Sequence, residues 1–259
     1  FYGLAVLCIE DAEVRALLDD MPRHCITYGF VAEADVRASN ITQIGGQMHF
    51  LMHLPDGKTQ NITLNLPGNH NVLNALAAAA IAWQLGVTRE HIASALHKFQ
   101  GIGRRFNIKG ELTLKHGKAL MVDDYGHHPS ELAAVFAAAR GGWPEKRLVV
   151  AFQPHRYSRT RDLFDEFTAV LSTADAVVLT DVYAAGETAI LGSDSKSLAR
   201  SIRARGRLNP VVVGAAQQLR SVLGDVLKDG DLLLIMGAGD IGAVSNDLVK
   251  HGLDLENIG

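Results

Sequence analysis

The sequence predicts an α/β protein whose second part is a doubly wound, mostly parallel sheet, and three observations lead to this prediction. Short, nearly all-apolar runs recur in the second part of the 259-residue chain, as they do in strands that are buried on both faces of a parallel sheet. Segments with helical spacing alternate with these runs, which is typical of repeated βα units. Polar clusters follow the runs directly, where parallel strands end and ligands bind.

The composition indicates a globular protein with a core of its own. Charged residues make up 20% of the chain and hydrophobic residues 47%, while the net charge is −3. Without a long basic run or an apolar run of ~18 residues, we expect neither a nucleic-acid partner nor a membrane partner. Two distant cysteines, Cys8 and Cys25, make neither a disulfide framework nor a zinc site, so we expect a cytoplasmic protein. Because the chain begins at Phe1 in mid-pattern, we also expect a fragment.

The first hundred residues combine strand patterns with helical ones. Asp11 is a plausible N-cap for a helix over residues 11–20. Strands are then predicted over residues 25–30, 36–44, 48–54 and 59–66, with a hairpin turn at Asp56-Gly57. An alanine-rich helix over residues 71–85 follows, and Thr88 caps a second helix over residues 89–99.

Gly101 and Gly103, between a helix and new strands, predict a hinge or domain boundary. We therefore divide the chain into domains over residues 1–100 and 101–259. Strands of the second domain are predicted over residues 110–115, 119–123, 147–152, 176–182, 210–213 and 231–236. Helices are predicted over residues 130–140, 161–173, 195–204, 215–227 and 240–250.

Four polar clusters follow predicted strands, so we expect them to share one rim and one cleft. They span residues 123–129, 153–159, 181–187 and 237–240. Residues 123–128 read Asp-Asp-Tyr-Gly-His-His, and their two carboxylates and two imidazoles are suitable metal ligands. Neighbours on a strand point to opposite faces, however, so these four side chains cannot all converge. Asp124 also suits a ribose diol. Alternatively, Asp124 and His128 cap the next helix.

Arginines and asparagines supply further candidates. Arg156 and Arg159, three residues apart, can fork onto a carboxylate or phosphate, or they form a solvated basic loop. Arg104-Arg105 at the hinge can reach a triphosphate as domains close, or is an ordinary surface pair. Asn71 and Asn74 share one face of a helix and can read a nucleobase edge. The alternative is that Asn71 caps the helix and Asn74 is simply exposed.

Two glycine motifs suggest other chemistry. Residues 237–242 match G-x-G-x-x-G between a strand and a helix, and an NAD-linked oxidoreductase is therefore kept as the alternative function, although the rest of the dinucleotide fingerprint is missing. No strand or suitably spaced acidic residue follows, since the chain ends 17 residues later. Gly57-Lys58-Thr59 resembles the end of a phosphate loop, but Met52 stands where its first glycine belongs.

Taken together, these motifs resemble the Mur ligases, ATP-dependent enzymes that add amino acids to peptidoglycan precursors. The matching stretches, in order, are residues 68–75, 99–106, 123–129, 153–163, 182–187 and 237–242. Residues 153–163 and the two later stretches are typical of the member that adds L-alanine. The resemblance implies that residues 1–100 are the later part of an α/β ATPase domain and that residues 101–259 are a Rossmann-like domain.

The resemblance also implies roles for individual residues. Asn71 and Asn74 lie at the adenine, Asp124 at the ribose and Arg105 at the phosphates, while Arg105 and His127 take part in catalysis. The amino-acid substrate meets residues from two clusters, with the arginines pairing with its carboxylate. This group comprises His127, Arg156 and Arg159, with Tyr125 and His155 as neighbours.

The implied reaction uses ATP to activate the carboxylate of UDP-N-acetylmuramate as an acyl phosphate, which the amine of L-alanine then attacks. Positioning and charge stabilisation carry such a reaction without a covalent enzyme nucleophile. Mg²⁺ and the phosphate loop would be held upstream of Phe1, so we assign no metal ligand here and expect this chain alone to be inactive. A non-catalytic binding module on the same fold is a further alternative.

Overall fold

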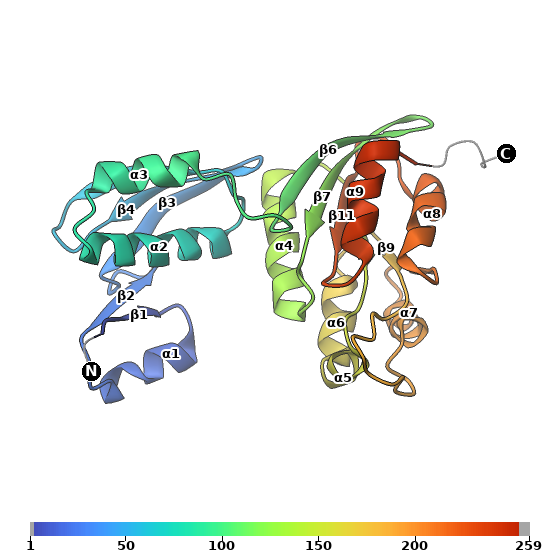
Figure 1. Cartoon of the computed structure of the whole chain (residues 1–259), viewed down its shortest axis with the longest axis horizontal. Coiled ribbons are helices and arrows are strands. Elements are labelled where there is room, and N and C mark those ends of the chain that lie inside the picture. Colours follow the sequence, from blue (N-terminus) through green and yellow to red (C-terminus); the bar gives the residue numbers. More distant parts are fainter. Residues whose placement is uncertain (1–2, 254–259) are drawn as a thin grey trace. The chain divides into compact units, whose positions relative to one another are not determined.

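The computed structural model describes residues 3–253, which form two compact units that divide between Gly101 and Ile102 (Figure 1). Each unit has its own sheet and its own buried core. Among the described residues, none of the helices has the length and apolar character needed to cross a membrane.

The first unit is a five-stranded sheet with helices packed on it. Its strands, in both chain order and sheet order, are β1 (Ala5–Cys8), β2 (Cys25–Gly29), β3 (Val36–Ile44), β4 (Gln47–His53) and β5 (Thr59–Leu64). The first three are parallel, and β4 and β5 continue as antiparallel neighbours. Helices α2 (Asn69–Gln84) and α3 (Arg89–Lys98) bury Val72, Leu76 and Ile92 in the core that lies against the sheet.

The sequence pattern missed part of this unit. Strand β1 was not predicted, because four half-buried residues show neither alternation nor flanking turn signals. The helix predicted over residues 11–20 is only α1 (Ala12–Ala16) followed by a 3₁₀ turn (Leu18–Asp20), and neither element buries a side chain. The predicted N-caps Asp11 and Thr88 are both confirmed.

The second unit is the doubly wound α/β sheet that the sequence predicts. Its six strands are ordered β10-β9-β8-β11-β7-β6, and all neighbours are parallel except β6 and β7. The strands are β6 (Asn107–Leu114), β7 (Gly117–Asp124), β8 (Leu148–Phe152), β9 (Ala176–Leu179), β10 (Val211–Val212) and β11 (Leu232–Met236). All five residues of β8 and of β11 are buried, as expected of central strands.

Helices cover both faces of this sheet (Figure 1). One core contains residues of α4 (Pro129–Gly142), α6 (Phe164–Leu171) and α7 (Ser195–Ala204), whereas the other contains residues of α8 (Leu219–Val226) and α9 (Ile241–His251). Along β8, Val150 faces the first core and Val149 the second. In sheets of this kind ligands bind outside the carboxyl ends of the strands.

One predicted helix differs in a way that matters for function. Residues 161–173 were predicted as one helix, but the structure has α5 (Tyr157–Asp162) and α6, which meet at Leu163. Leu163 has a φ of −118° and a ψ of 29°, outside the helical range. Helix α5 therefore begins inside the polar cluster that follows β8, with Arg156 as its N-cap residue.

Candidate active site

Four aromatic rings form a row along the carboxyl edge of the sheet in the second unit. Tyr125 meets His127 edge-on at 5.3 Å between ring centroids, and His127 lies 5.6 Å from His155. Tyr183 stacks on His155 at 5.4 Å with 16° between the ring planes. These rings follow β7, β8 and β9, so the structure brings three of the predicted polar clusters together at one rim.

The two arginines of the predicted hinge lie in different surroundings. Arg104, at a φ of 60°, is half-buried and donates to the carbonyl of Gly237, with Nε 3.4 Å from Asp123 Oδ1. Arg105 is exposed, and its guanidinium lies 3.5 Å from Glu131 and 5.6 Å from the centre of the Tyr125 ring. Arg104 is thus part of the internal scaffold, and Arg105 is the one that can meet an anion.

Asp123 and Asp124 end β7 and point to different partners, as the alternation of a strand requires. The buried Asp123 faces Arg104 and Lys109. Asp124 is 3% exposed and accepts hydrogen bonds from the backbone N–H groups of Phe106 (2.7 Å) and Gly126 (2.6 Å). Burial raises the pKa of Asp124, although these hydrogen bonds and Arg105 oppose the rise.

Of the alternative in which Asp124 and His128 cap α4, the His128 half is confirmed and the Asp124 half is wrong, because His128 and Glu131 form the capping box of that helix. The side chain of His128 accepts from Ser130, and Glu131 accepts from the backbone of His128. Asp124 ties the chain at Phe106 to the end of β7 instead. Its contact with a ribose stays a prediction.

The hydrogen bonds of His127 fix which ring nitrogen carries the proton. Its Nδ1 lies 3.2 Å from the carbonyl oxygen of Tyr125 and 3.6 Å from Oε2 of Glu131. Both partners accept, so Nδ1 carries the proton and Nε2 of the neutral ring is an acceptor. A half-buried imidazole in this state can take a proton from an ammonium group beside it.

His155 has the opposite arrangement. Arg159 donates through one guanidinium nitrogen to Nδ1 and to the carbonyl oxygen of His155, each at 3.3 Å. Because the guanidinium has only donors, Nδ1 accepts and Nε2 carries the proton in the neutral ring. Burial lowers the pKa of His155, and the positive charges of Arg159, of His127 when it is protonated, and of Arg156 lower it further. His155 is therefore neutral at pH 7 and holds Arg159 in place.

The lowered pKa of His155 gives a testable pH dependence. The unfolded chain binds a proton near pH 6.5, whereas folded His155 binds one only at lower pH, so its contribution to stability is present above that value and is lost as pH falls. NMR titration of the His155 ring is expected to give a pKa below 6.5. Arg159→Gln should raise this pKa by removing a nearby charge, and an unchanged value would contradict the assignment.

Arg156 and Arg159 lie on the first turn of α5 or just before it, and both are anchored. Arg156 is exposed, has a φ of 72°, and lies 3.7 Å from Glu187. Glu187 also accepts from the hydroxyl (2.6 Å) and the backbone N–H (3.0 Å) of Ser158. The alternative of a freely solvated basic loop is thus replaced by two arginines in defined positions.

The glycine-rich turn over residues 237–242 is packed against protein side chains. A Cβ on Gly239 would lie 2.3 Å from Gln153 Oε1 and 2.7 Å from the Tyr183 ring, and one on Gly242 would lie 2.4 Å from the Arg104 guanidinium. These contacts explain the glycines without a dinucleotide. The motif therefore gives no reason of its own to prefer the NAD alternative.

In the first unit, Asn71 and Asn74 occupy one face of α2, whose N-cap is Gly68 rather than Asn71. Asn71 is 8% exposed and donates to the carbonyl of Pro67 at 2.8 Å, whereas Asn74 is exposed. The amide of Asn74 lies 3.5 Å from Asn71 Oδ1. The pair is therefore linked, with the Asn74 carboxamide at the surface.

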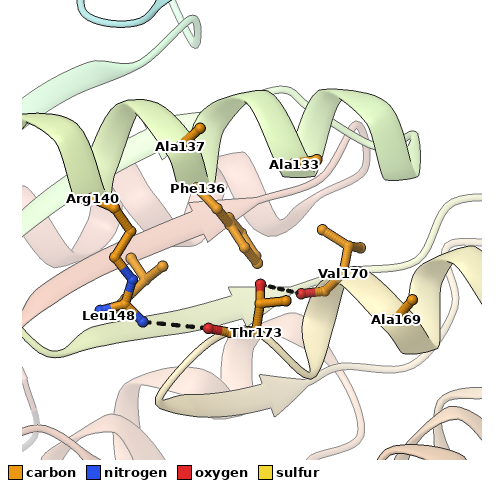
Figure 2. A pocket seen from close by; sticks show the side chains of 8 residues that line it. All are labelled: Ala133, Phe136, Ala137, Arg140, Leu148, Ala169, Val170 and Thr173. Atoms are coloured by element: carbon orange, nitrogen blue, oxygen red, sulfur yellow. Dashed lines mark hydrogen bonds between the residues drawn. The ribbon is translucent and has the colours of Figure 1, made fainter.

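A pocket of the second unit and the arrangement of possible metal ligands both bear on the predicted site. Figure 2 shows a pocket between α4 and α6, lined by alanines together with Phe136, Leu148 and Arg140, and it contains none of the predicted site residues. Within residues 3–253, no group of three or more His, Cys, Asp or Glu side chains is arranged to hold a metal ion.

The sequence did not single out Glu131, Tyr183 or Glu187 as individual residues of this rim. Tyr183 and Glu187 belong to a cluster that was noted only as a motif. The position of Tyr183 and Glu187 just after β9 could have indicated their role, because β9 pairs with β8 and the two following loops lie side by side. Contact between two loops cannot be read from spacing within either loop.

The two units match two domains of one enzyme family, and the chain belongs to the Mur ligases. Residues 104–239 match the Mur ligase glutamate ligase domain and residues 1–82 match the Mur ligase middle domain. The chain is similar to UDP-N-acetylmuramate–L-alanine ligase of Stenotrophomonas maltophilia strain R551-3, being 65% identical over 253 residues. The match covers 97% of this chain and 53% of that protein, so the chain spans about half the length of the relative.

Another relative and two solved structures are also similar to this chain. The ligase of the same name from Xanthomonas campestris pv. campestris strain B100 is also 65% identical, over 97% of this chain and 53% of its own. The crystal structure of UDP-N-acetylmuramate–alanine ligase from Thermotoga maritima superimposes with a TM-score of 0.72 at 27% identity, covering 95% of this chain and 51% of that one. A Thermotoga maritima MurF ligase in complex with ADP shares the fold at a TM-score of 0.67 and 16% identity, covering 96% and 54%.

Proposed function

We propose that this chain supplies the amino-acid side of an ATP-dependent ligase that joins L-alanine to UDP-N-acetylmuramate. The observation that carries the proposal is the pair Arg156 and Arg159, which are held in place by Glu187 and by His155 at the carboxyl edge of the sheet. Two fixed guanidinium groups suit the carboxylate of a small amino acid. The 65% identity to ligases of that name supports the same substrate.

In this proposal each residue of the rim has a separate task. Arg156 and Arg159 bind the carboxylate of L-alanine, and Nε2 of His127 accepts a proton from its ammonium group, which must become a neutral amine before it can attack. Tyr125 and His155 line the same space. The exposed Arg105 offsets negative charge on phosphate groups.

ATP is proposed as the activating cofactor, with Asn74, and Asn71 behind it, contacting the adenine edge. The exposed Asn74 carboxamide has an acceptor oxygen and a second N–H beside the one that faces Asn71, a pair of the kind that reads a nucleobase edge. The described residues do not fit Mg²⁺, because they include no cluster of acidic or histidine ligands. We therefore assign this chain no metal-dependent step.

A chimera tests the proposal directly. In it, this chain replaces the matching 253 residues of the Stenotrophomonas maltophilia ligase, and formation of the L-alanyl product from ATP, UDP-N-acetylmuramate and L-alanine is measured. We expect turnover by the chimera and none by the 259-residue chain alone. A folded but inactive chimera would refute the substrate assignment, and turnover by the isolated chain would refute the expectation that it holds only part of the machinery.

A further inference from the structure

The loop that follows β9 is fastened to the start of α5 by contacts of several kinds. The backbone of Tyr183 donates to Pro154 and accepts from Arg156, each at 2.8 Å, and its ring stacks on His155. Glu187, four residues further on, reaches the same segment through its carboxylate. Two loops that are about thirty residues apart in sequence thus behave as one local structure.

Glu187 does for α5 what a capping side chain normally does. The first N–H groups of a helix have no partner within the helix, and Arg156, at the N-cap position, makes no side-chain capping bond. Glu187 accepts from the N–H of Ser158 and from its hydroxyl, so the cap comes from another loop. Its pKa is lowered, first by the hydroxyl of Ser158 and then by the backbone N–H, so the carboxylate is charged at neutral pH.

The cap matters because of the backbone of Arg156. A φ of 72° in a residue other than glycine is strained and persists only where the surroundings enforce it. Arg156 is held on one side by its N–H bond to Tyr183 and on the other by the capped turn at Ser158. The ion pair between Arg156 and Glu187, at 3.7 Å with half of the arginine side chain exposed, is weak by itself.

We propose that Glu187 is a positioning residue for L-alanine: by capping α5 from the neighbouring loop, it keeps Arg156 in the strained conformation that aims its guanidinium at the substrate carboxylate. This inference rests on the proposed function. It assigns Glu187 no contact with the substrate, and it implies that the loop of residues 183–187 sets the affinity for the amino acid without taking part in the chemical step.

The test uses steady-state kinetics of the active chimera. Glu187→Gln keeps the size of the side chain but removes its charge, so the hydrogen bonds from Ser158 and the ion pair with Arg156 all weaken. We expect the apparent KM for L-alanine to rise about tenfold, with kcat at saturating L-alanine and the KM for ATP changed by less than about twofold. An unchanged or lower KM for L-alanine would overturn the proposal. A fall in kcat at saturating substrates without a rise in this KM would also overturn it.

Two further variants make the test specific. Ser158→Ala removes the hydroxyl that binds Glu187, so it should raise the same KM and add little in the double variant, whereas Ser158→Thr should retain the wild-type value. Fully additive effects would contradict a shared contact. If Glu187→Gln lowers expression or melting temperature sharply, Ser158→Ala alone decides the matter.

Asp162→Asn is the matched control. It removes one negative charge from α5, the helix that Glu187 caps, where Asp162 pairs with the exposed Arg161, and it should leave all constants unchanged. An inactive parent chimera would count against the proposed function. An active chimera whose Glu187→Gln variant binds L-alanine normally would count against this inference alone.

Discussion

Replacing Asp124 by alanine is expected to destabilise the unit of residues 102–259 by about 2–4 kcal/mol. The carboxylate is buried and accepts from Phe106 N and Gly126 N. Truncation leaves two buried N–H groups without partners, at about 1–3 kcal/mol each. Part of this loss is offset because burial of the charged form is itself unfavourable, as the raised pKa of Asp124 indicates.

Thermal unfolding of the variant measures the effect. For a unit of this size, about 2–4 kcal/mol corresponds to a fall in melting temperature of roughly 5–15 °C. Asp124→Asn should cost less than alanine, because it retains one acceptor and removes the buried charge. Asp181→Ala, at an exposed aspartate just beyond β9, is the control and should stay within about 0.5 kcal/mol of the wild type. Equal effects at both positions would contradict the role of burial.

The second large effect is expected at Arg159. In the chimera, Arg159→Ala should raise the apparent KM for L-alanine about 10- to 100-fold, which corresponds to about 1.5–3 kcal/mol for a hydrogen bond to a charged group. Arg159 is half-buried and held by two contacts to His155, so little of its binding energy is spent on ordering the side chain. Arg156→Ala should act in the same direction but less strongly, because Arg156 is exposed.

Lysine and a neighbouring arginine supply the controls for this prediction. Arg159→Lys retains the charge but not the planar fork, so it should recover only part of the lost affinity. Arg161→Ala removes an exposed arginine that is paired with Asp162 and should leave the KM unchanged. Unchanged kinetics for both Arg156→Ala and Arg159→Ala would contradict the assignment of these arginines to the carboxylate of L-alanine.

The alternation of apolar runs and helical segments was enough to predict the fold class, because central strands such as β8 and β11 are buried on both faces and have no polar residue. Strand β1 was missed, and the helix over residues 161–173 was wrongly joined. Both errors occur where an element is short, since short elements depend more on their neighbours than on their own pattern.

The candidate site was predictable only in its residue types and its location. Clusters that follow parallel strands meet at one edge for topological reasons, so the sequence placed His127, His155 and the two arginines at a common rim. The structure adds which arginine of the pair Arg104-Arg105 is exposed. Burial of one and exposure of the other depend on Asp123 and Gly237, which lie far away in the chain.

The sequence by itself determined the family, the fold class and the order of the polar clusters, since all three are written in local patterns and motifs. Only the tertiary structure decided that Asp124 fastens Phe106 to β7, that Arg104 covers the glycine-rich turn, and that Glu187 caps a helix in another loop. Each of these decisions is a hydrogen bond or a packing contact between distant segments. Such contacts depend on how the strands are ordered in the sheet, and no spacing within one segment records that order.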